Sequence, residues 1–167
     1  VQIDHIVVSP PGVHVLETKT QKGEIISAPQ ESPWQVKRRG QVCNIANPIL
    51  QNHTQVQACT SLLVELGVHV PCSGLIVMTR TMAQAKWPTV PLDNLGTYFD
   101  EDANKKKPVL TPRQVRRLAK DLLSFQVRGR APWQKEQGHW RAFAIAVLVP
   151  LLLYALGLAV IIVKNRF

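Results

Sequence analysis

The chain has 167 residues, with 20 Lys and Arg against 11 Asp and Glu and a formal net charge of +9. This length allows one modest domain with a short appendage. Its three cysteines cannot all pair and show no C-x-x-C spacing, which excludes a disulfide-rich secreted fold. An uncharged apolar run over residues 142–163 excludes both a purely soluble globule and a disordered polar tail.

The first twenty residues predict a β-hairpin. Residues 2–8 are rich in β-branched side chains and lead into a Ser-Pro-Pro-Gly turn at residues 9–12. Residues 13–19 then form the returning strand. A four-residue loop makes the numbers of facing residues sum to 21, which places Val8 opposite Val13.

Two further pieces of extended chain are expected before the first helix. Residues 24–27 have the composition of a short strand. Residues 34–36 and 41–44 flank the basic, glycine-containing turn at residues 37–40, which predicts a second hairpin.

Asn47 and Pro48 predict the start of a helix, with Asn as N-cap and Pro at the first helical position. Apolar residues then recur at helical spacing as far as Leu66, and Gly67 ends the helix. Residues 74–79 are nearly all apolar, as in a strand covered on both faces. Strands, a helix and a buried strand in this order indicate an α/β or α+β sandwich.

The composition changes beyond residue 95. Residues 100–108 are charged and poor in apolar side chains, which predicts a linker. Thr111 and Pro112 then start another helix. Its expected buried side comprises Val115, Leu118 and Leu122, and its expected basic side comprises Arg113, Arg116, Arg117 and Lys120. Residues 128–139 are expected to form an irregular connector.

The apolar run at residues 142–163 predicts a transmembrane helix. A helix of 22 residues is about 33 Å long, enough to cross the ~30 Å hydrocarbon layer. Trp140 suits an interfacial anchor, and Lys164 and Arg166 close the far end. Four basic residues in the preceding twenty, against two after the run, favour a single-pass protein with its N-terminal domain in the cytoplasm. A buried core helix is the alternative interpretation.

Three charged side chains meet on one face of the first hairpin. In the expected register Asp4 lies opposite Glu17, and the two-residue period of a strand puts Lys19 on the same face. Opposed like charges destabilise a sheet, and a hard divalent cation such as Mg²⁺ compensates for them because it prefers carboxylate oxygens. Such an ion polarises a phosphoryl oxygen, and Lys19 would stabilise charge that develops on the phosphate. The pattern favours metal-assisted phosphodiester hydrolysis, and a solvated face with a minor ion pair is the alternative.

Residues 2–8, followed by residues 12–19 and Gly23, resemble the opening of the nuclease-related domain (NERD) family. Residues 47–52 resemble that family's next motif, and residues 74–79 its later buried strand. By its pattern, this family belongs to the PD-(D/E)XK nuclease superfamily.

The resemblance implies roles for individual residues. Asp4 and Glu17 would be metal ligands, with the backbone carbonyl of Thr18 as a further contact. Lys19 would be the catalytic lysine, and Gln51 resembles a glutamine that related enzymes place near the active site. The implied cofactor is Mg²⁺ or Mn²⁺. The five histidines and three cysteines show no zinc-like cluster.

The resemblance also implies an α/β fold, a restriction-endonuclease-like mixed sheet flanked by helices. Family members have a helix with an acidic residue ahead of the first strand. Because the sequence starts at the strand, we expect this fold to lack that helix and to carry one C-terminal transmembrane helix. The expected organisation is a nuclease-related domain (1–95), a charged linker, basic helix and juxtamembrane connector (96–141), the transmembrane helix (142–163) and a short tail (164–167).

Basic residues dominate residues 105–141, where eleven Lys and Arg stand against two acidic residues. Such a stretch binds either nucleic-acid phosphates or anionic lipid. We expect contact with the lipid bilayer at residues 128–141 and DNA contact through the basic side of the helix that starts at Pro112, with a merely solvated helix face as the alternative. The sequence therefore predicts a membrane-anchored, metal-dependent nuclease acting on DNA. The alternative is a non-catalytic nucleic-acid-binding or membrane-adaptor protein that has kept the fold.

Overall fold

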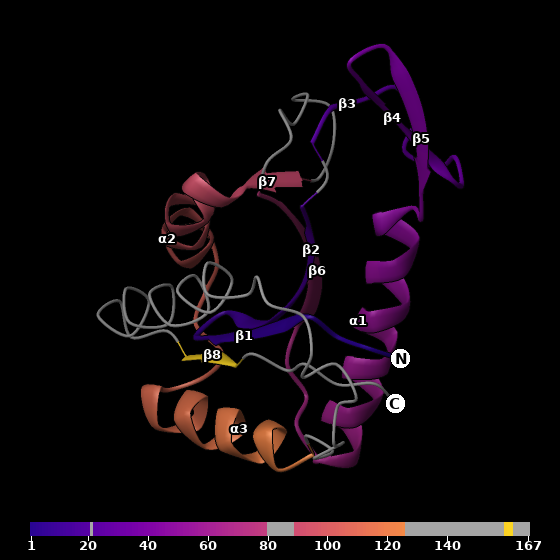
Figure 1. Ribbon diagram of the computed structural model, residues 1–167. Helices are drawn as coiled ribbons and strands as arrows, with labels where there is room; N and C mark the ends of the chain where they lie inside the picture. The colour runs from indigo at the N-terminus through magenta and orange to yellow at the C-terminus, as the bar shows by residue number, and fades with distance from the viewer. Residues whose placement is uncertain (21, 80–88, 126–158, 162–167) are drawn as a thin grey trace, which may run out of the picture.

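The computed structural model describes residues 1–20, 22–79, 89–125 and 159–161 of the chain, which form a central five-stranded sheet and a smaller three-stranded one (Figure 1). In order across the central sheet, the strands are β7 (Thr89–Pro91), β6 (Cys72–Met78), β2 (Gly12–Lys19), β1 (His5–Ser9) and β8 (Ala159–Ile161). β1 is antiparallel to both of its neighbours, whereas β2, β6 and β7 are parallel. The small antiparallel sheet consists of β3 (Glu24–Ile25), β4 (Trp34–Arg38) and β5 (Gln41–Ile45). The mixed central sheet and its helices confirm the predicted α/β class.

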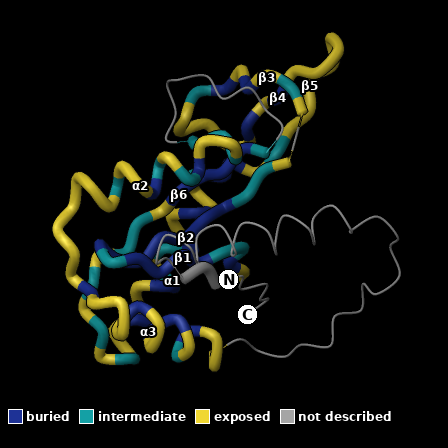
Figure 2. The backbone as a smooth tube through the Cα atoms, turned by 90° about the vertical axis from the view of Figure 1, so that its left-hand side faces the viewer, coloured by how far each residue is buried: buried dark blue, intermediate teal, exposed yellow. Residues whose placement is uncertain are grey.

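Helices cover both faces of the central sheet. α1 (Pro48–Glu65) and α3 (Pro112–Ser124) pack on one face, and α2 (Leu95–Lys105), which follows the short 3₁₀ turn η1 (Leu92–Asn94), packs on the other. The chain is most deeply buried along β1, β2 and β6 and exposed along the outer sides of the helices (Figure 2). The fold thus has three layers, helix, sheet and helix.

The first hairpin has the predicted register. Val8 faces Val13 and Ile6 faces Val15 across the antiparallel pair of β1 and β2. The strands extend further into the turn than expected, so that only two prolines connect them, and this leaves the register unchanged. Since β1 begins at His5, Asp4 lies immediately ahead of the strand.

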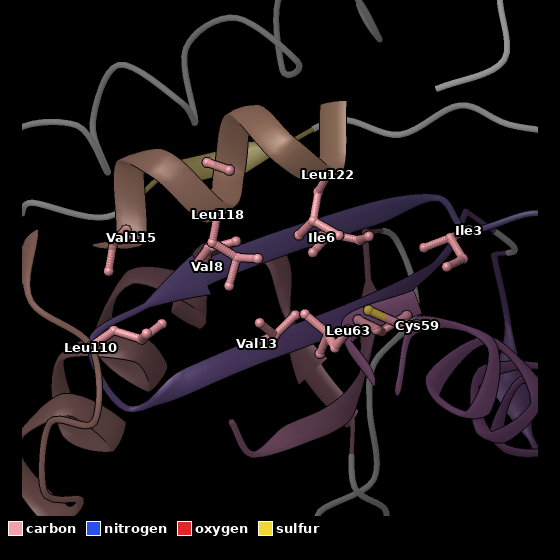
Figure 3. Close-up of a cluster of buried hydrophobic side chains, with 12 residues drawn as sticks. Ile3, Ile6, Val8, Val13, Cys59, Leu63, Leu110, Val115, Leu118 and Leu122 are labelled. Carbon is pink, nitrogen blue, oxygen red and sulfur yellow. The ribbon is translucent and has the colours of Figure 1, made fainter. Parts of the chain in front are cut away.

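Alternate side chains of the hairpin form two separate cores. Ile6, Val8 and Val13 point toward α1 and α3, where they pack against Leu63 and Leu118 (Figure 3). Val7 and Leu16 point the other way and pack beneath α2. Full burial of an aliphatic side chain of this size stabilises a fold by about 1.5–3 kcal/mol, which explains why β-branched residues fill both faces.

α1 begins and ends where the sequence predicts. The Asn47 side-chain oxygen accepts hydrogen bonds from the backbone N–H groups of Ile49, at 2.8 Å, and Leu50, at 3.4 Å. At the other end Gly67 has a φ of 67°, and the N–H of the following Val68 donates to the carbonyl of Leu63 at 2.9 Å. This left-handed glycine and its hydrogen bond form a Schellman cap.

The second hairpin is also confirmed, with a tighter turn than expected. Arg38 pairs with Gln41, which leaves only Arg39 and Gly40 between β4 and β5. Both residues have positive φ, 49° and 79°, as a type I′ turn requires.

The prediction of a linker at residues 100–108 is wrong for residues 100–105, because these residues continue α2. Leu95 and Phe99 are one helical turn apart and are both buried against the sheet. Most of the charged residues face outward, where Lys105 bonds to Glu101 at 2.6 Å, whereas the Asp102 side chain is only 10% exposed. A high charge content therefore marks the solvated side of this helix.

The helix predicted from Thr111 is confirmed as α3. The Thr111 hydroxyl accepts from the N–H of Gln114 at 3.3 Å, and the Gln114 side chain accepts from the N–H of Thr111 at 2.8 Å, which together make a capping box. The buried side contains the three residues expected and one more; it comprises Val115, Leu118, Ala119 and Leu122.

No helix among the described residues is long and apolar enough to cross a membrane. Three residues of the predicted span, Ala159–Ile161, form β8 and pair antiparallel with Ile6–Val8 of β1. The helical prediction is wrong at these three residues, whose main chain extends the sheet. The remainder of the predicted span, the connector at 128–139 and the tail at 164–167 lie outside the described residues.

Candidate functional site

A connected group of polar side chains lies at the end of β2. The Lys19 ammonium is 2.6 Å from Glu17 Oε1 and donates a hydrogen bond of 2.6 Å to Gln51 Oε1 in the first turns of α1. The Glu17 side chain is only 6% exposed and that of Lys19 14% exposed. Because this ion pair is largely removed from water, its electrostatic interaction is stronger than that of a surface pair.

Gln55, one turn further along α1, completes this group. Its side-chain nitrogen donates to Glu17 Oε2 at 2.6 Å, so both carboxylate oxygens of Glu17 have partners. We call Glu17, Lys19, Gln51 and Gln55 the Glu17 cluster. Sequence reasoning identified three of its members and missed Gln55. The available signal was its i, i+4 spacing from Gln51, which the resemblance already placed near the active site.

The close approach of α1 to the sheet depends on Asn52 and Gly74. The Asn52 side-chain nitrogen donates to the carbonyl of Val15 at 2.9 Å. A Cβ atom at position 74 would collide with Asn52 Oδ1, so only glycine leaves room for this side chain. The two residues thereby hold the first turns of α1, with Gln51 and Gln55, directly over β2.

The Asp4 side chain contacts the main chain of β2. Its Oδ2 accepts a hydrogen bond of 3.1 Å from the backbone N–H of Thr18, between Glu17 and Lys19. His5 lies on the other side of the sheet, where its Nδ1 is 3.3 Å from the Thr18 hydroxyl. The structure therefore brings Asp4 to the same end of β2 as the Glu17 cluster, and we call these five residues together the candidate site.

The candidate site offers the kind of donors that a hard divalent cation takes. Carboxylates of Asp4 and Glu17 and the backbone carbonyl of Thr18 are all oxygen ligands, which Mg²⁺ and Mn²⁺ accept. Within the described part of the chain, no group of three or more His, Cys, Asp or Glu side chains is placed to hold a metal ion. An ion here would thus rely on two carboxylates, a main-chain oxygen and water, a set that fits Mg²⁺ because this ion usually keeps several waters.

The four basic residues predicted to contact DNA lie elsewhere. They are exposed on the outer side of α3, at the opposite end of α1 from Gln51 (Figure 1). One of them, Arg117, lies 3.9 Å from Asp121 in its own helix. The structure therefore confirms their exposure on one side of the helix and leaves them apart from the candidate site. They are Arg113, Arg116, Arg117 and Lys120.

A mixed sheet with Glu17-x-Lys19 on a central strand, and Asp4 at the entry to its antiparallel neighbour, is compatible with a nuclease-like fold. Residues 1–79 match the family model of the nuclease-related domain (NERD). Nuclease-related domains belong to the PD-(D/E)XK-like class of nucleases, which usually depend on divalent metal ions. No curated protein and no solved structure matches the chain significantly. The match indicates a nuclease-related function for the part of the chain that contains the candidate site.

A second polar group lies on the opposite face of the sheet, beneath α2. The His14 side chain is 3% exposed, with its Nδ1 3.0 Å from the Ser73 hydroxyl and its Nε2 3.4 Å from Asp102 Oδ2. Phe99 packs edge-on against this ring, with 5.2 Å between ring centroids. Burial lowers the pKa of His14, and the nearby carboxylate of Asp102 only partly opposes this effect.

This lowered pKa predicts that the folded protein loses stability in mild acid. The unfolded chain takes up a proton at His14 near the ordinary pKa of about 6.5, whereas the folded chain resists it, so the stability contributed by neutral His14 is complete above this pH and falls below it. We expect the melting temperature of His14→Gln to depend less on pH than that of the wild type between about pH 7.5 and pH 5. His69→Gln, at an exposed position, is the control and should follow the wild type. If the melting temperatures of all three proteins changed equally with pH, the prediction would be contradicted.

Proposed function

We propose that this protein is a metal-dependent nuclease that hydrolyses DNA phosphodiester bonds at the candidate site. The observation that supports the proposal most is the placement of the Lys19 ammonium, which Glu17 and Gln51 hold at the end of β2. A surface lysine would sample many rotamers, whereas two short contacts restrict this one to a single direction. Preorganised charge of this kind is the usual source of transition-state stabilisation in phosphoryl transfer.

Each residue has a distinct role in this proposal. Asp4, Glu17 and the Thr18 carbonyl would hold the divalent cation, which supplies Lewis-acid polarisation of the phosphate and activation of water when bound. Lys19 stabilises negative charge that develops on the phosphate oxygens. Gln51 orients the ammonium group of Lys19, and Gln55 is a positioning residue that fixes the Glu17 carboxylate through its 2.6 Å hydrogen bond.

Two basic surfaces are available for the DNA backbone. The first is the outer side of α3 predicted from the sequence. The second is the turn between β4 and β5, where Lys37, Arg38 and Arg39 are all exposed. The turn belongs to the hairpin that leads directly into α1, and this hairpin lies at the same end of the molecule as the first turn of α1 (Figure 1). Basic side chains on either surface would bind phosphates with release of counterions, which makes binding salt-sensitive.

Cleavage of a DNA substrate in the presence of Mg²⁺ or EDTA tests the proposal directly. We expect cleavage with Mg²⁺, loss of cleavage with EDTA, and a decrease of about 10²-fold or more for Asp4→Asn. Asparagine keeps an oxygen that accepts from Thr18 N–H, so this change removes the charge and preserves the hydrogen bond. Asp93→Asn, at an exposed position in η1, is the matched control and should cleave like the wild type.

The alternative function predicts a different result in the same experiment. A non-catalytic DNA-binding protein would bind DNA in a salt-sensitive manner and cleave nothing under any metal condition. Cleavage that is equal in wild type and Asp4→Asn would place the activity elsewhere or in a contaminant. Either result contradicts the proposed catalytic role of Asp4.

We further propose attachment to a membrane through residues 142–163, with the nuclease-related domain in the cytoplasm. This proposal is supported by the length of the uncharged run and by the excess of basic residues before it. A spanning helix over the whole run requires Ala159–Ile161 to leave β1, so the proposal concerns a membrane-bound state in which β8 is not formed. Retention of the full chain in membranes after alkaline carbonate extraction would support the anchor, and its complete release would contradict it.

A further inference from the structure

Cys59 and Cys72 form a pair of reduced cysteines between α1 and β6. Cys59 is fully buried on the inner side of α1, whereas Cys72 is half-buried at the first position of β6. Both lie in the apolar cluster that α1 forms with the sheet, where Figure 3 labels Cys59 close to Leu63. Their thiol groups are hydrogen-bonded to each other. The third cysteine, Cys43, is exposed on β5 and belongs to the other sheet.

The two thiols differ in reactivity. The hydrogen bond from Cys59 lowers the pKa of Cys72 to about 7 against the opposing effect of burial, and Thr60 contributes in the same direction as Cys59. The same hydrogen bond, together with burial, raises the pKa of Cys59. Cys72 is therefore the more acidic and the more accessible of the two thiols, and acidity and access are the properties that make a cysteine react with oxidants.

We propose that Cys72 and Cys59 are a peroxide-responsive pair that closes to a disulfide between β6 and α1. The Cys72 thiolate attacks hydrogen peroxide, breaks its O–O bond and becomes a sulfenic acid, and the displaced hydroxide leaves as water after protonation. The Cys59 sulfur then attacks the Cys72 sulfur and displaces the sulfenic hydroxide, which takes up the Cys59 proton and leaves as a second water. Two thiols thus lose two electrons to one peroxide, and a thiol reductant reverses the change.

The disulfide would join the helix that frames the candidate site to the sheet. Cys59 follows Gln55 by one helical turn on the same buried side of α1. A disulfide requires an S–S distance of about 2.05 Å, shorter than any hydrogen bond between thiols, so its formation draws this part of α1 toward β6. A consequence for cleavage rests on the proposed function, whereas the disulfide itself is detected without any activity measurement.

Peptide mapping of the oxidised full chain tests the proposal. No Lys or Arg lies between Arg39 and Arg80, so trypsin leaves all three cysteines in one peptide. A glutamyl endopeptidase cuts after Glu65, which is the only acidic residue between Cys59 and Cys72. After treatment with hydrogen peroxide at about pH 7.5, alkylation and this digestion, the two fragments should remain joined until a reductant is added.

Single cysteine variants distinguish a disulfide between Cys59 and Cys72 from other products of oxidation. Cys43→Ser is the matched control and should form the same cross-link. Cys59→Ser should stop at the sulfenic acid, which dimedone traps on Cys72. In Cys72→Ser the remaining buried thiol should react with peroxide at least about tenfold more slowly than Cys72 does in the wild type. Separate fragments from the oxidised wild type, or over-oxidation of Cys72 without a cross-link in Cys43→Ser, would overturn the proposal.

Discussion

Replacement of Glu17 by Gln is expected to lower metal-dependent DNA cleavage by about 10²–10³-fold, the loss typical when one preorganised charged or polar group is removed from an active site. Glutamine has nearly the same size as Glu17 and its oxygen can still accept from Gln55, so the packing beneath α1 is preserved. The change removes the negative charge that would hold the cation and that directs the Lys19 ammonium. Initial rates of cleavage at saturating Mg²⁺, measured beside the melting temperature, would separate lost chemistry from lost folding.

The control for this prediction is Glu65→Gln. Glu65 is exposed at the last position of α1, so the same chemical change there should leave cleavage unchanged. A Glu17→Gln protein that is folded and retains more than about a tenth of wild-type cleavage would exclude Glu17 from the catalytic site.

Replacement of Lys19 by Met is expected to lower the free energy of unfolding by about 3 kcal/mol, because it leaves the buried carboxylate of Glu17 without its counter-ion. Removal of the other charge, by Glu17→Gln, should lower the free energy of unfolding by less than Lys19→Met does. Lys19 is long, more exposed than Glu17, and able to extend its ammonium group into water. Urea denaturation should therefore show a larger loss of stability for Lys19→Met than for Glu17→Gln.

The double variant Glu17→Gln/Lys19→Met provides the decisive comparison. With both charges removed, the site contains only neutral groups, and its stability should return to within about 1 kcal/mol of the wild type while cleavage stays lost. If Lys19→Met alone costs less than about 1 kcal/mol, the pair is energetically equivalent to an exposed ion pair, and Lys19 is not held as the structure indicates.

Local patterns predicted much of the fold correctly because local interactions decide those features. The register of the first hairpin follows from the parity of its turn, and the structure places Val8 opposite Val13 as expected. The start of α1 follows from the capping oxygen of Asn47, and its end from the left-handed conformation of Gly67. Each of these features depends on contacts within a few residues, which a sequence displays directly.

The segment that became α2 shows where such patterns fail. Its charged residues predict a linker, whereas Leu95 and Phe99 lie one helical turn apart and are buried against the sheet. Composition cannot distinguish a solvated helix from a solvated linker, because the difference lies in whether a distant strand offers an apolar surface. In the same way, the partner of β1 at Ala159–Ile161 is more than a hundred residues away and leaves no signal beside the strand.

The sequence alone predicts which chemical groups meet at the candidate site, since Asp4 immediately precedes β1, Glu17 and Lys19 lie on β2, and the pairing of these two strands is local. How these groups are held depends on contacts between elements that are distant in the sequence. Gln55 reaches Glu17 across 38 residues of sequence, and His14 reaches Asp102 on the other face of the sheet. The physical reason is that hydrogen bonds and burial act over a few ångströms in space, so residues distant in sequence meet only after α1 and α2 have packed on opposite faces of the sheet.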